Sequence, residues 1–326
     1  MRFSVRAERW PLRRPFAIAR ETIDTVPMIH LEIADDGAVG RAEAIGVDYR
    51  GETAESIALE VSAFLAGRTV APTREEVAAL LHPGGARNAI DTALWDLEAK
   101  CAGQPVWRLA GLPEPRPLRT CYTIGLGAPA VMADAVADAP ADAPLKVKLG
   151  GRDGLDTARV AAVRARAPAA DILVDVNQAW SIEELEAHAG PLADLGVQLI
   201  EQPLPAGADG LLSRYAGAVP LCADESFDVA ADLDRLGAYA CVNVKLDKCG
   251  GLTAALEIAR AAAARGVDLF VGCMLGTSLG MAPAFLLGGL CRHVDLDGPL
   301  LLARDRTPAL RYDGAMMRPF GPELWG

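Results

Sequence analysis

Two lysines stand one residue apart at the end of a short apolar run. In "LKVKLGG", residues 145–151, Lys146 and Lys148 alternate with apolar residues. Side chains two positions apart on a strand share a face, so both ammonium groups should point the same way. Two like charges side by side cost free energy unless neighbouring groups make use of them. The pair therefore marks a candidate functional site.

Carboxylates and further polar residues end other apolar runs along the chain. In chain order they are Asp175 and Asn177, Glu201, Asp224 and Glu225, Lys245, and Asp295 and Asp297. Neighbouring carboxylates repel one another in a low-dielectric cleft unless a cation joins them. Oxygen ligands without His or Cys suit a hard ion, so we expect Mg²⁺ on Asp175, Glu201 and Asp224. The alternative is that each carboxylate pairs with a lysine or caps the next helix.

The apolar runs recur with a regular spacing in the second part of the chain. Eight of them start at residues 119, 145, 171, 197, 220, 241, 268 and 292. Ala-rich amphipathic stretches such as "LDTARVAAVRARAP" lie between them. Eight strand–helix repeats predict an α/β fold, a parallel (β/α) TIM barrel with an imperfect first or last unit. The alternative is a doubly wound open sheet, but neither GxGxxG nor GxxxxGK[ST] occurs after a first strand.

The first part of the chain has a different pattern. Residues 1–112 combine strand-like alternation, as in "MIHLEIADDG", with two helical patterns, the second having apolar residues at 90, 93, 94 and 97. The proline-rich "GLPEPRPL" at 111–118 is the predicted boundary. We therefore expect an α+β domain over 1–112 and the barrel over 113–303. Residues 304–326 break the repeat and are expected to return to the first domain.

The barrel prediction gives the lysines a chemical role. Strand-end residues lie at the barrel mouth. The second and sixth of eight strands are opposed, so Lys148 and Lys245 would face each other across the metal. Two bases on opposite faces of one carbon can remove a proton from one side and return it on the other. We expect Lys146, with the metal, to lower the pKa of Lys148. The metal would stabilise the enediolate that forms beside a carboxylate.

Composition excludes several other classes of protein. The 326 residues are 51% hydrophobic and carry a net charge of -11, which is unfavourable for binding nucleic-acid backbones. Seven scattered cysteines include no CxxC pair, so we expect neither zinc nor a disulfide framework, and a reducing cytoplasm. Residues 269–291 are uncharged, but five glycines and a proline favour a buried strand, a glycine loop and a buried helix over a membrane span.

These motifs resemble the muconate-lactonizing subgroup of the enolase superfamily. The matching segments are "KVK" at 146–148, "DVN" at 175–177, "EQP" at 201–203, "ADES" at 223–226 and "NVKLDKCGG" at 243–251. "GCML" at 272–275 and "DLDGP" at 295–299 are most like the dipeptide epimerases, especially the L-Ala-D/L-Glu epimerases of murein peptide metabolism. The resemblance implies an isomerase with one Mg²⁺ per subunit. It also implies a modified barrel with an α+β capping domain formed by the N-terminal part and the C-terminal tail.

The resemblance also implies a role for each site residue. It makes Asp175, Glu201 and Asp224 the metal ligands, Asn177 their support, Lys148 and Lys245 the acid/base pair, and Thr123, Lys146 and Cys273 substrate contacts. Asp295 and Asp297 would hold the free ammonium of a dipeptide, since a period of two puts both on one face. Arg20, on a loop of the capping domain, would read a glutamate side chain. The alternative for Arg20 is an ion pair with Glu21 or another acid.

Several alternatives stay open at this point. o-Succinylbenzoate synthase and muconate cycloisomerase use the same lysines without needing Asp295 and Asp297. A Schiff-base lyase on a barrel would need no metal, and a binding protein on this fold would catalyse nothing. Lys245 is preferred to Lys248 as the base because it ends the apolar run "CVNVK". We expect a small dipeptide as partner, with no nucleic acid or membrane, and leave a homo-oligomer open.

Overall fold

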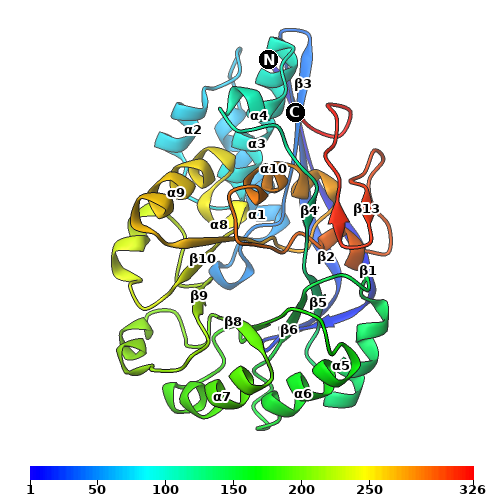
Figure 1. The fold of residues 1–326 in the computed structure, drawn as a ribbon. Helices are drawn as coiled ribbons and strands as arrows, with labels where there is room; N and C mark the ends of the chain where they lie inside the picture. The colour runs from blue at the N-terminus through cyan, green and yellow to red at the C-terminus, as the bar shows by residue number, and fades with distance from the viewer.

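The computed structural model describes residues 1–326. Its N-terminal part contains an antiparallel sheet in the order β1-β2-β3 (Figure 1). The strands are β1 (Arg2–Ala17), β2 (Thr22–Asp35) and β3 (Ala38–Ala44). Asp36 and Gly37 both have positive φ, 47° and 78°, as a tight hairpin turn between β2 and β3 requires. The β1–β2 connection carries Arg20, which reaches towards the second part of the chain.

Helices cover one face of this sheet. They are α1 (Ala54–Leu65), α2 (Arg74–Leu80), α3 (Gly85–Ala102) and α4 (Val106–Leu109), after a 3-10 turn, η1 (Asp48–Arg50). Capping boxes start α1 and α2, because Thr53 and Thr73 accept from the backbone three residues on. The apolar positions 90, 93, 94 and 97 of α3 are all buried, as their spacing predicts, and share a core with β2. We call residues from β1 to α4 the cap.

The second part is a curled sheet of eight parallel strands. They are β5 (Tyr122–Ile124), β6 (Leu145–Lys148), β7 (Ile172–Asp175), β8 (Val197–Glu201), β9 (Leu221–Ala223), β10 (Cys241–Val244), β11 (Asp268–Val271) and β12 (His293–Val294). They pair in chain order from β5 to β12. Cys121 N donates to Val294 O over 2.8 Å, which joins the two edges. The predicted barrel is confirmed, and the doubly wound alternative is wrong because the strand order never reverses.

The connections of the barrel are less regular than its strands. The α-helices are α5 (Pro129–Ala135), α6 (Asp156–Arg166), α7 (Ile182–Asp194), α8 (Leu246–Cys249), α9 (Leu252–Arg265), α10 (Ser278–Gly288) and α11 (Gly298–Leu301), with a 3-10 turn, η2 (Val136–Asp138), after α5. After β8 and β9 the chain forms only 3-10 turns, η3 (Asp209–Arg214) and η4 (Ala230–Arg235). Glycine and proline interrupt the first of these segments, "PAGADGLLSRYAGAVP", which explains why no full helix forms there.

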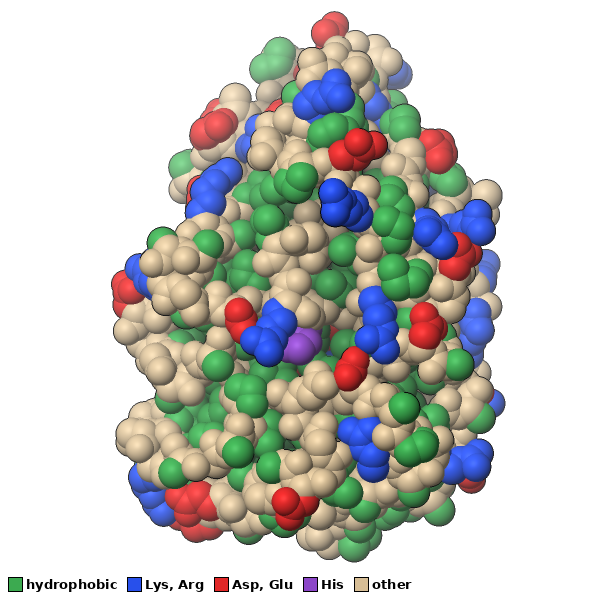
Figure 2. All heavy atoms as spheres, viewed as in Figure 1, with side chains coloured by type: hydrophobic (Ala, Val, Ile, Leu, Met, Phe, Trp, Pro, Cys, Tyr) green, Lys and Arg blue, Asp and Glu red, His purple; other side chains and the backbone are tan.

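The uncharged segment 269–291 divides as predicted. It forms β11, a glycine-containing loop and the buried helix α10. No helix in the structure has the length and apolar character needed to cross a membrane. On the face drawn in Figure 2, side chains of both charge signs are interspersed.

The last residues of the chain form a small sheet and contact the cap. A small sheet joins β4 (Leu118–Arg119) to β13 (Tyr312–Asp313) and β14 (Met316–Met317). Beyond it, Arg41 of β3 donates to the carbonyls of Glu323 and Leu324 over 2.8 and 2.7 Å. In Figure 1 both ends of the chain lie at the cap end of the molecule.

One buried contact ties the end of β3 to a barrel loop. Glu43 accepts hydrogen bonds from Thr277 N at 2.7 Å and from Thr277 Oγ1 at 2.5 Å. Thr277 is the N-cap residue of α10 and closes the loop that follows β11. The cap therefore holds Thr277, which ends the loop at 272–277.

Candidate active site

Polar residues stand in register at the carboxyl ends of neighbouring barrel strands. Lys148 pairs with Asp175, and Asp175 with Glu201, across β6, β7 and β8. Asp224 directly follows β9 and Lys245 directly follows β10. Because the carboxyl ends of parallel strands meet at one edge, all five side chains lie at the barrel mouth.

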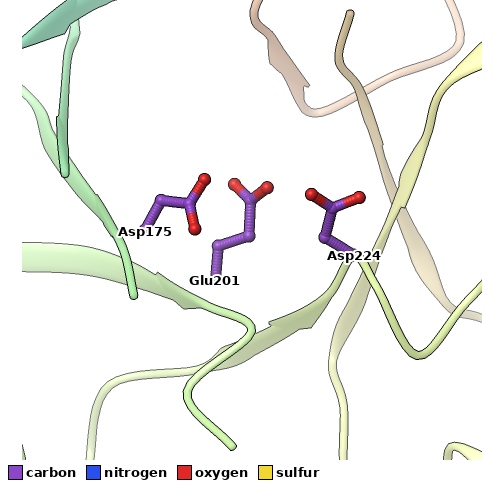
Figure 3. A group of neighbouring side chains, drawn as sticks. All are labelled: Asp175, Glu201 and Asp224. Carbon is purple, nitrogen blue, oxygen red and sulfur yellow. The ribbon is translucent and has the colours of Figure 1, made fainter. Parts of the chain in front are cut away.

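The structure brings three of the predicted carboxylates together. One oxygen from each of Asp175, Glu201 and Asp224 lies within 4.8 Å of the others, and Figure 3 shows the three side by side, facing the same space. Burial, and then the charge of Asp175, raise the pKa of Glu201 to about 8. Burial would also raise the pKa of Asp175, but Lys148 and Lys146 hold it at about 2. Such a crowded set of carboxylates favours a bound cation.

Unpartnered oxygens around this triad test whether a cation fits. Four buried oxygens accept no hydrogen bond: Asn177 Oδ1, Glu201 Oε2, Glu225 Oε2 and Asn243 Oδ1. Glu201 Oε2 does lie 2.9 Å from Lys146 Nζ, but outside hydrogen-bonding geometry. Buried acceptors without donors are costly unless a cation satisfies them. All of them are hard oxygen donors, so the residues fit Mg²⁺.

The two proposed bases lie on opposite sides of the triad. Lys148 Nζ lies 2.6 Å from Asp175 Oδ2, at one end of the triad. Lys245 Nζ lies 2.7 Å from Asp224 Oδ2, at the other end. Burial would lower the pKa of Lys245, but the charge of Asp224 raises it above its ordinary range. A reacting carbon above Glu201 would therefore have one amine on each side.

Lys146 lies deeper than either of these lysines. Its side chain is 2% exposed and is ion-paired with Asp175, Glu201 and Asp295 at 3.3, 2.9 and 2.9 Å. Burial would lower its pKa, but those three carboxylates raise it well above the ordinary value. Lys146 is thus a fixed positive charge in the floor of the site. Its predicted contact with substrate stays a prediction.

Lys248 is occupied by structural contacts. Its Nζ donates to Asp224 Oδ1 at 2.6 Å, to Asp224 O at 2.5 Å and to Phe227 O at 2.9 Å. An ammonium group has three donors, and here all of them are used. Of the two lysines after β10, only Lys245 can turn its amine towards a bound molecule without losing backbone contacts. This geometry favours Lys245 as the base.

Thr123 links the two acids that follow the last strand. Its backbone N donates to Asp297 Oδ2 at 2.6 Å, and its Oγ1 donates to Asp295 Oδ1 at 3.4 Å. The period-of-two argument for the two acids is wrong, because β12 ends at Val294 and Asp297 is the N-cap residue of α11. The acids nevertheless converge on Thr123. Burial, and then the charge of Asp295, raise the pKa of Asp297 to about 7.

Cys273 lies near the same acids, in the loop after β11. Burial raises the pKa of its thiol well above the ordinary value, and the charges of Asp295 and Asp297 add to this effect. The thiol is therefore neutral and acts as a small, weakly polar surface. Its predicted contact with substrate, like that of Thr123, stays a prediction.

Arg20 reaches the site from the cap. Its Nη1 lies 2.9 Å from Glu225 Oε1, and its Nη2 lies 3.9 Å from Asp48 Oδ2. Asn177 Nδ2 donates to the same Glu225 oxygen at 3.3 Å. The ion pair predicted as the alternative for Arg20 does form, with Glu225 and Asp48. Glu225 also places Arg20 within reach of the barrel mouth.

Sequence reasoning missed several residues of the site. Asn243 Nδ2 donates to Glu201 Oε1 at 2.8 Å, and its position two residues before Lys245 was the available signal. Gln202 accepts from Asp224 N at 2.9 Å and so holds the strand end. Tyr49 of the cap lies beside Arg20, whose guanidinium is 5.3 Å from its ring centre, and no local pattern marks it.

An eight-stranded parallel barrel with three clustered carboxylates between two lysines defines an enzyme of the enolase type. Residues 1–111 match the family described as "Mandelate racemase / muconate lactonizing enzyme, N-terminal domain". Residues 131–313 match the "Enolase C-terminal domain-like" family. The chain belongs to the mandelate racemase/muconate lactonizing enzyme family of the enolase superfamily.

Two similar relatives have different substrates. The L-Ala-D/L-Glu epimerase of Escherichia coli (strain K12) is 40% identical over 308 residues, covering 94% of this chain and 95% of that protein. The N-acetyl-D-glutamate racemase of a Pseudoalteromonas species is 40% identical over 303 residues, covering 92% of this chain and 95% of that protein. Both names describe the inversion of one carbon centre.

Solved structures agree with this assignment. One is an enolase family member from Agrobacterium tumefaciens, described as having homology to dipeptide epimerases, whose structure contains bound sodium and L-Ala-L-Glu. It has a TM-score of 0.94 and 43% identity, covering 99% of both chains. A dipeptide epimerase from Enterococcus faecalis V583, complexed with Mg and L-Leu-L-Tyr, has a TM-score of 0.90 and 27% identity, covering 99% of this chain and 98% of that one.

Proposed function

We propose that the protein is a dipeptide epimerase that interconverts L-Ala-L-Glu and L-Ala-D-Glu. One observation carries the proposal: Lys148 and Lys245 lie at opposite ends of the carboxylate triad, 2.6 and 2.7 Å from its two outer members. That arrangement suits inversion, which needs a proton donor and a proton acceptor on opposite faces of one carbon. The similarity to the Escherichia coli and Agrobacterium proteins supports the choice of substrate.

In the proposed reaction the α-carbon of the second residue lies between the two amines. One lysine, as a neutral amine, takes the α-proton through Nζ, and the electron pair moves into the adjacent carboxylate. The other lysine, as an ammonium group, returns a proton through Nζ to the opposite face. Reversing the roles converts the other epimer, so each lysine must be able to hold either charge state.

We propose that Asp175, Glu201 and Asp224 hold Mg²⁺, with Asn177 as a supporting residue. When bound, the ion supplies positive charge that stabilises the developing negative charge on the substrate carboxylate and lowers the pKa of the nearby lysines. The hard oxygen donors and the unpartnered acceptors around the triad support this ion.

The two ends of the dipeptide would meet opposite charges. At the amine end Asp295, Asp297 and Thr123 form an acidic lobe beside Cys273. At the side-chain end Arg20 supplies positive charge from the cap. We accordingly propose a division of the chain into a capping domain over 1–112 and 304–326, which binds the side chain, and a barrel over 113–303, which performs the chemistry.

A second candidate is racemisation of an N-acylated glutamate. The Pseudoalteromonas relative acts on such a compound by its name. Two features of the amine end also favour it: Asp295 is already paired with Lys146 at 2.9 Å, and the pKa of Asp297 is raised to about 7. A protonated Asp297 could donate a hydrogen bond to an acyl carbonyl, which carries no ammonium group.

Exchange in D₂O separates these candidates. With Mg²⁺ present, the enzyme should add one mass unit at the glutamate α-carbon of L-Ala-L-Glu much faster than in N-acetyl-L-glutamate. The opposite preference would favour the racemase. Exchange that survives chelation, with trapping by borohydride, would instead support the Schiff-base lyase. Mass photometry of the same sample would determine the oligomeric state.

A further inference from the structure

Six buried side-chain polar atoms in the structure have no hydrogen-bond partner. They are Tyr49 Oη, Asn177 Oδ1, Glu201 Oε2, Glu225 Oε2, Asp228 Oδ1 and Asn243 Oδ1. Five of the six are amide or carboxylate oxygens, which accept hydrogen bonds when the carboxylates are ionised. Tyr49 is the one hydroxyl donor among them. Four of the acceptors surround the metal site described above, and Asp228 forms an ion pair with Arg50. The unused donor is the one feature that a cation does not explain.

Tyr49 belongs to a cap loop that is attached near Lys245. It lies on η1 of the cap, in a loop whose backbone N–H groups at Ile45 and Gly46 both donate to Asp247 Oδ1 at 3.0 Å. Asp247 follows Lys245 by two residues, so the cap loop is attached to the strand end that carries the proposed base. Glu52 stiffens the other side of the loop by accepting from Val47 N at 2.7 Å.

The neighbours of the Tyr49 ring place it beside the mouth: Arg20 lies against it, and Arg20 Nη1 lies 2.9 Å from Glu225, the residue after Asp224. Burial, and then the negative charge of Asp224, raise the pKa of Tyr49 well above its ordinary value, while Lys245 opposes the rise. The guanidinium of Arg20 lies 5.3 Å from the centre of the Tyr49 ring, and that of Arg50 lies 5.7 Å from it. The ring therefore lies beside Arg20, the cation that we propose binds the acidic side chain of the substrate.

A second donor would strengthen the binding of a carboxylate at this end of the site. A carboxylate has two oxygens and accepts several hydrogen bonds. Arg20 already shares its charge with Glu225 at 2.9 Å, so an incoming carboxylate has to compete with Glu225 for the same guanidinium. A neutral hydroxyl beside Arg20 adds a donor without adding charge to be compensated in the free enzyme.

We propose that Tyr49 determines specificity, its hydroxyl donating a hydrogen bond to the acidic side chain of the substrate's second residue beside Arg20. The inference rests on the proposed epimerase function and extends it to the class of second residue. A side chain that accepts hydrogen bonds is then preferred, and glutamate is preferred to glutamine because hydrogen bonds to charged acceptors are stronger. The ring also helps to position Arg20 at this end of the site, because the guanidinium stacks on it.

The test compares Tyr49→Phe with wild type on two substrates, L-Ala-L-Glu and the neutral L-Ala-L-Met, with Mg²⁺ present. The variant keeps the ring and its contact with Arg20 and loses only the hydroxyl. For L-Ala-L-Glu we expect kcat/KM to fall about tenfold to a hundredfold, mainly through KM. For L-Ala-L-Met we expect a change of less than about twofold, since no hydrogen bond is lost.

Tyr215→Phe is the matched control. The Tyr215 hydroxyl donates to Val219 O at 2.7 Å, near the amino end of β9 and away from the mouth. This variant should match wild type on both substrates. Tyr49→Leu, which also lacks the hydroxyl, should repeat the selective loss, and thermal unfolding would verify that each variant is folded.

Two results would overturn the inference while leaving the epimerase proposal intact. One is an equal loss on both dipeptides, which would mean that Tyr49 only shapes the loop. The other is no loss on either. A wild-type enzyme that epimerises no dipeptide at all would overturn the proposed function itself, and the inference with it.

Discussion

Lys245 Nζ lies 2.7 Å from Asp224 Oδ2, so a proposed proton-transfer group and a proposed metal ligand are in direct contact. Because of this contact, protonation of Lys245 and binding of a cation to Asp224 depend on each other. Any cation that binds Asp224 weakens the hold of the carboxylate on the ammonium group and makes the neutral amine more accessible.

Removing the cation should stop the reaction. Exhaustive chelation should abolish epimerisation, and added Mg²⁺ should restore it, because a weakly acidic α-proton cannot leave quickly without charge stabilisation. A turnover of about 10 s⁻¹ corresponds to a barrier of about 16 kcal/mol. The measurement is turnover by optical rotation before and after metal addition. Full turnover in chelator would rule out the proposed mechanism.

Replacing Lys148 or Lys245 with Ala should abolish epimerisation in both directions. Each variant should still exchange the α-proton of one epimer with D₂O, because the opposite amine survives. Mass spectrometry of recovered L-Ala-L-Glu and L-Ala-D-Glu measures this exchange. The two variants must exchange different epimers. If both exchange the same one, the assignment of two bases is wrong.

Lys248→Met should reduce the stability of the fold rather than the chemistry alone. Its three donors hold the strand end at Asp224 and Phe227. Removing one partner of a buried ion pair typically costs about 3–5 kcal/mol. Urea unfolding should show this loss, whereas Lys245→Met should lose activity with a smaller change in stability. A stable but inactive Lys248→Met beside an active Lys245→Met would reverse the two roles.

Arg20→Ala should distinguish substrates by their second residue. We expect weaker turnover of L-Ala-L-Glu and little change for L-Ala-L-Met, since only the acidic side chain needs the guanidinium. The variant also leaves Glu225 without its 2.9 Å partner. Arg20→Gln, which retains donors, is the control for that loss. Equal losses on both substrates would make Arg20 a structural residue.

Asp91 should make stability depend on pH. It accepts from Thr253 N at 3.0 Å, and burial raises its pKa from 3.8 to about 6. Between those values the folded state holds a proton that the unfolded state has released, so the free energy of unfolding falls as pH rises from about 4 to 6. The loss at pH 7 is about 3 kcal/mol. The variant Asp91→Asn has no carboxyl group at this position and should not show this loss of stability.

Urea unfolding of wild type and Asp91→Asn at pH 4.5 and pH 7 checks this prediction. The variant should gain stability relative to wild type as pH rises, even if the lost hydrogen bond lowers both of its values. Parallel changes in the two proteins would show that the Asp91 carboxyl titrates normally.

The repeated strands and their polar ends could be predicted because they depend on local pattern. A strand that is buried on both sides reads as an apolar run, and the residue after it lies at the barrel mouth. Asp175, Glu201 and Asp224 could therefore be placed together from sequence. Lys245 could be preferred to Lys248 for the same reason, because one ends the strand and the other does not.

Contacts between distant segments could not be predicted in this way. Arg20 meets Glu225 across 205 residues, and Asp247 meets Gly46 across 201. No periodicity encodes such pairs, since they depend on how the cap sits on the barrel. The period-of-two argument for Asp295 failed for a related reason: β12 is only two residues long, and the chain turns into α11 before the pattern can apply.

The hydrogen bonds between Glu43 and Thr277 also constrain how the cap and barrel could be recombined between related proteins. Thr277 is fully buried, so a transplanted cap without an acceptor at the end of β3 would leave its N–H and hydroxyl unpaired. The start of α10 would then be held less firmly, and the loop that carries Cys273 would shift with it. A change confined to the tips of the cap loops carries no such penalty. New specificities in a protein of this design are therefore more accessible through point changes in those tips than through exchange of whole domains.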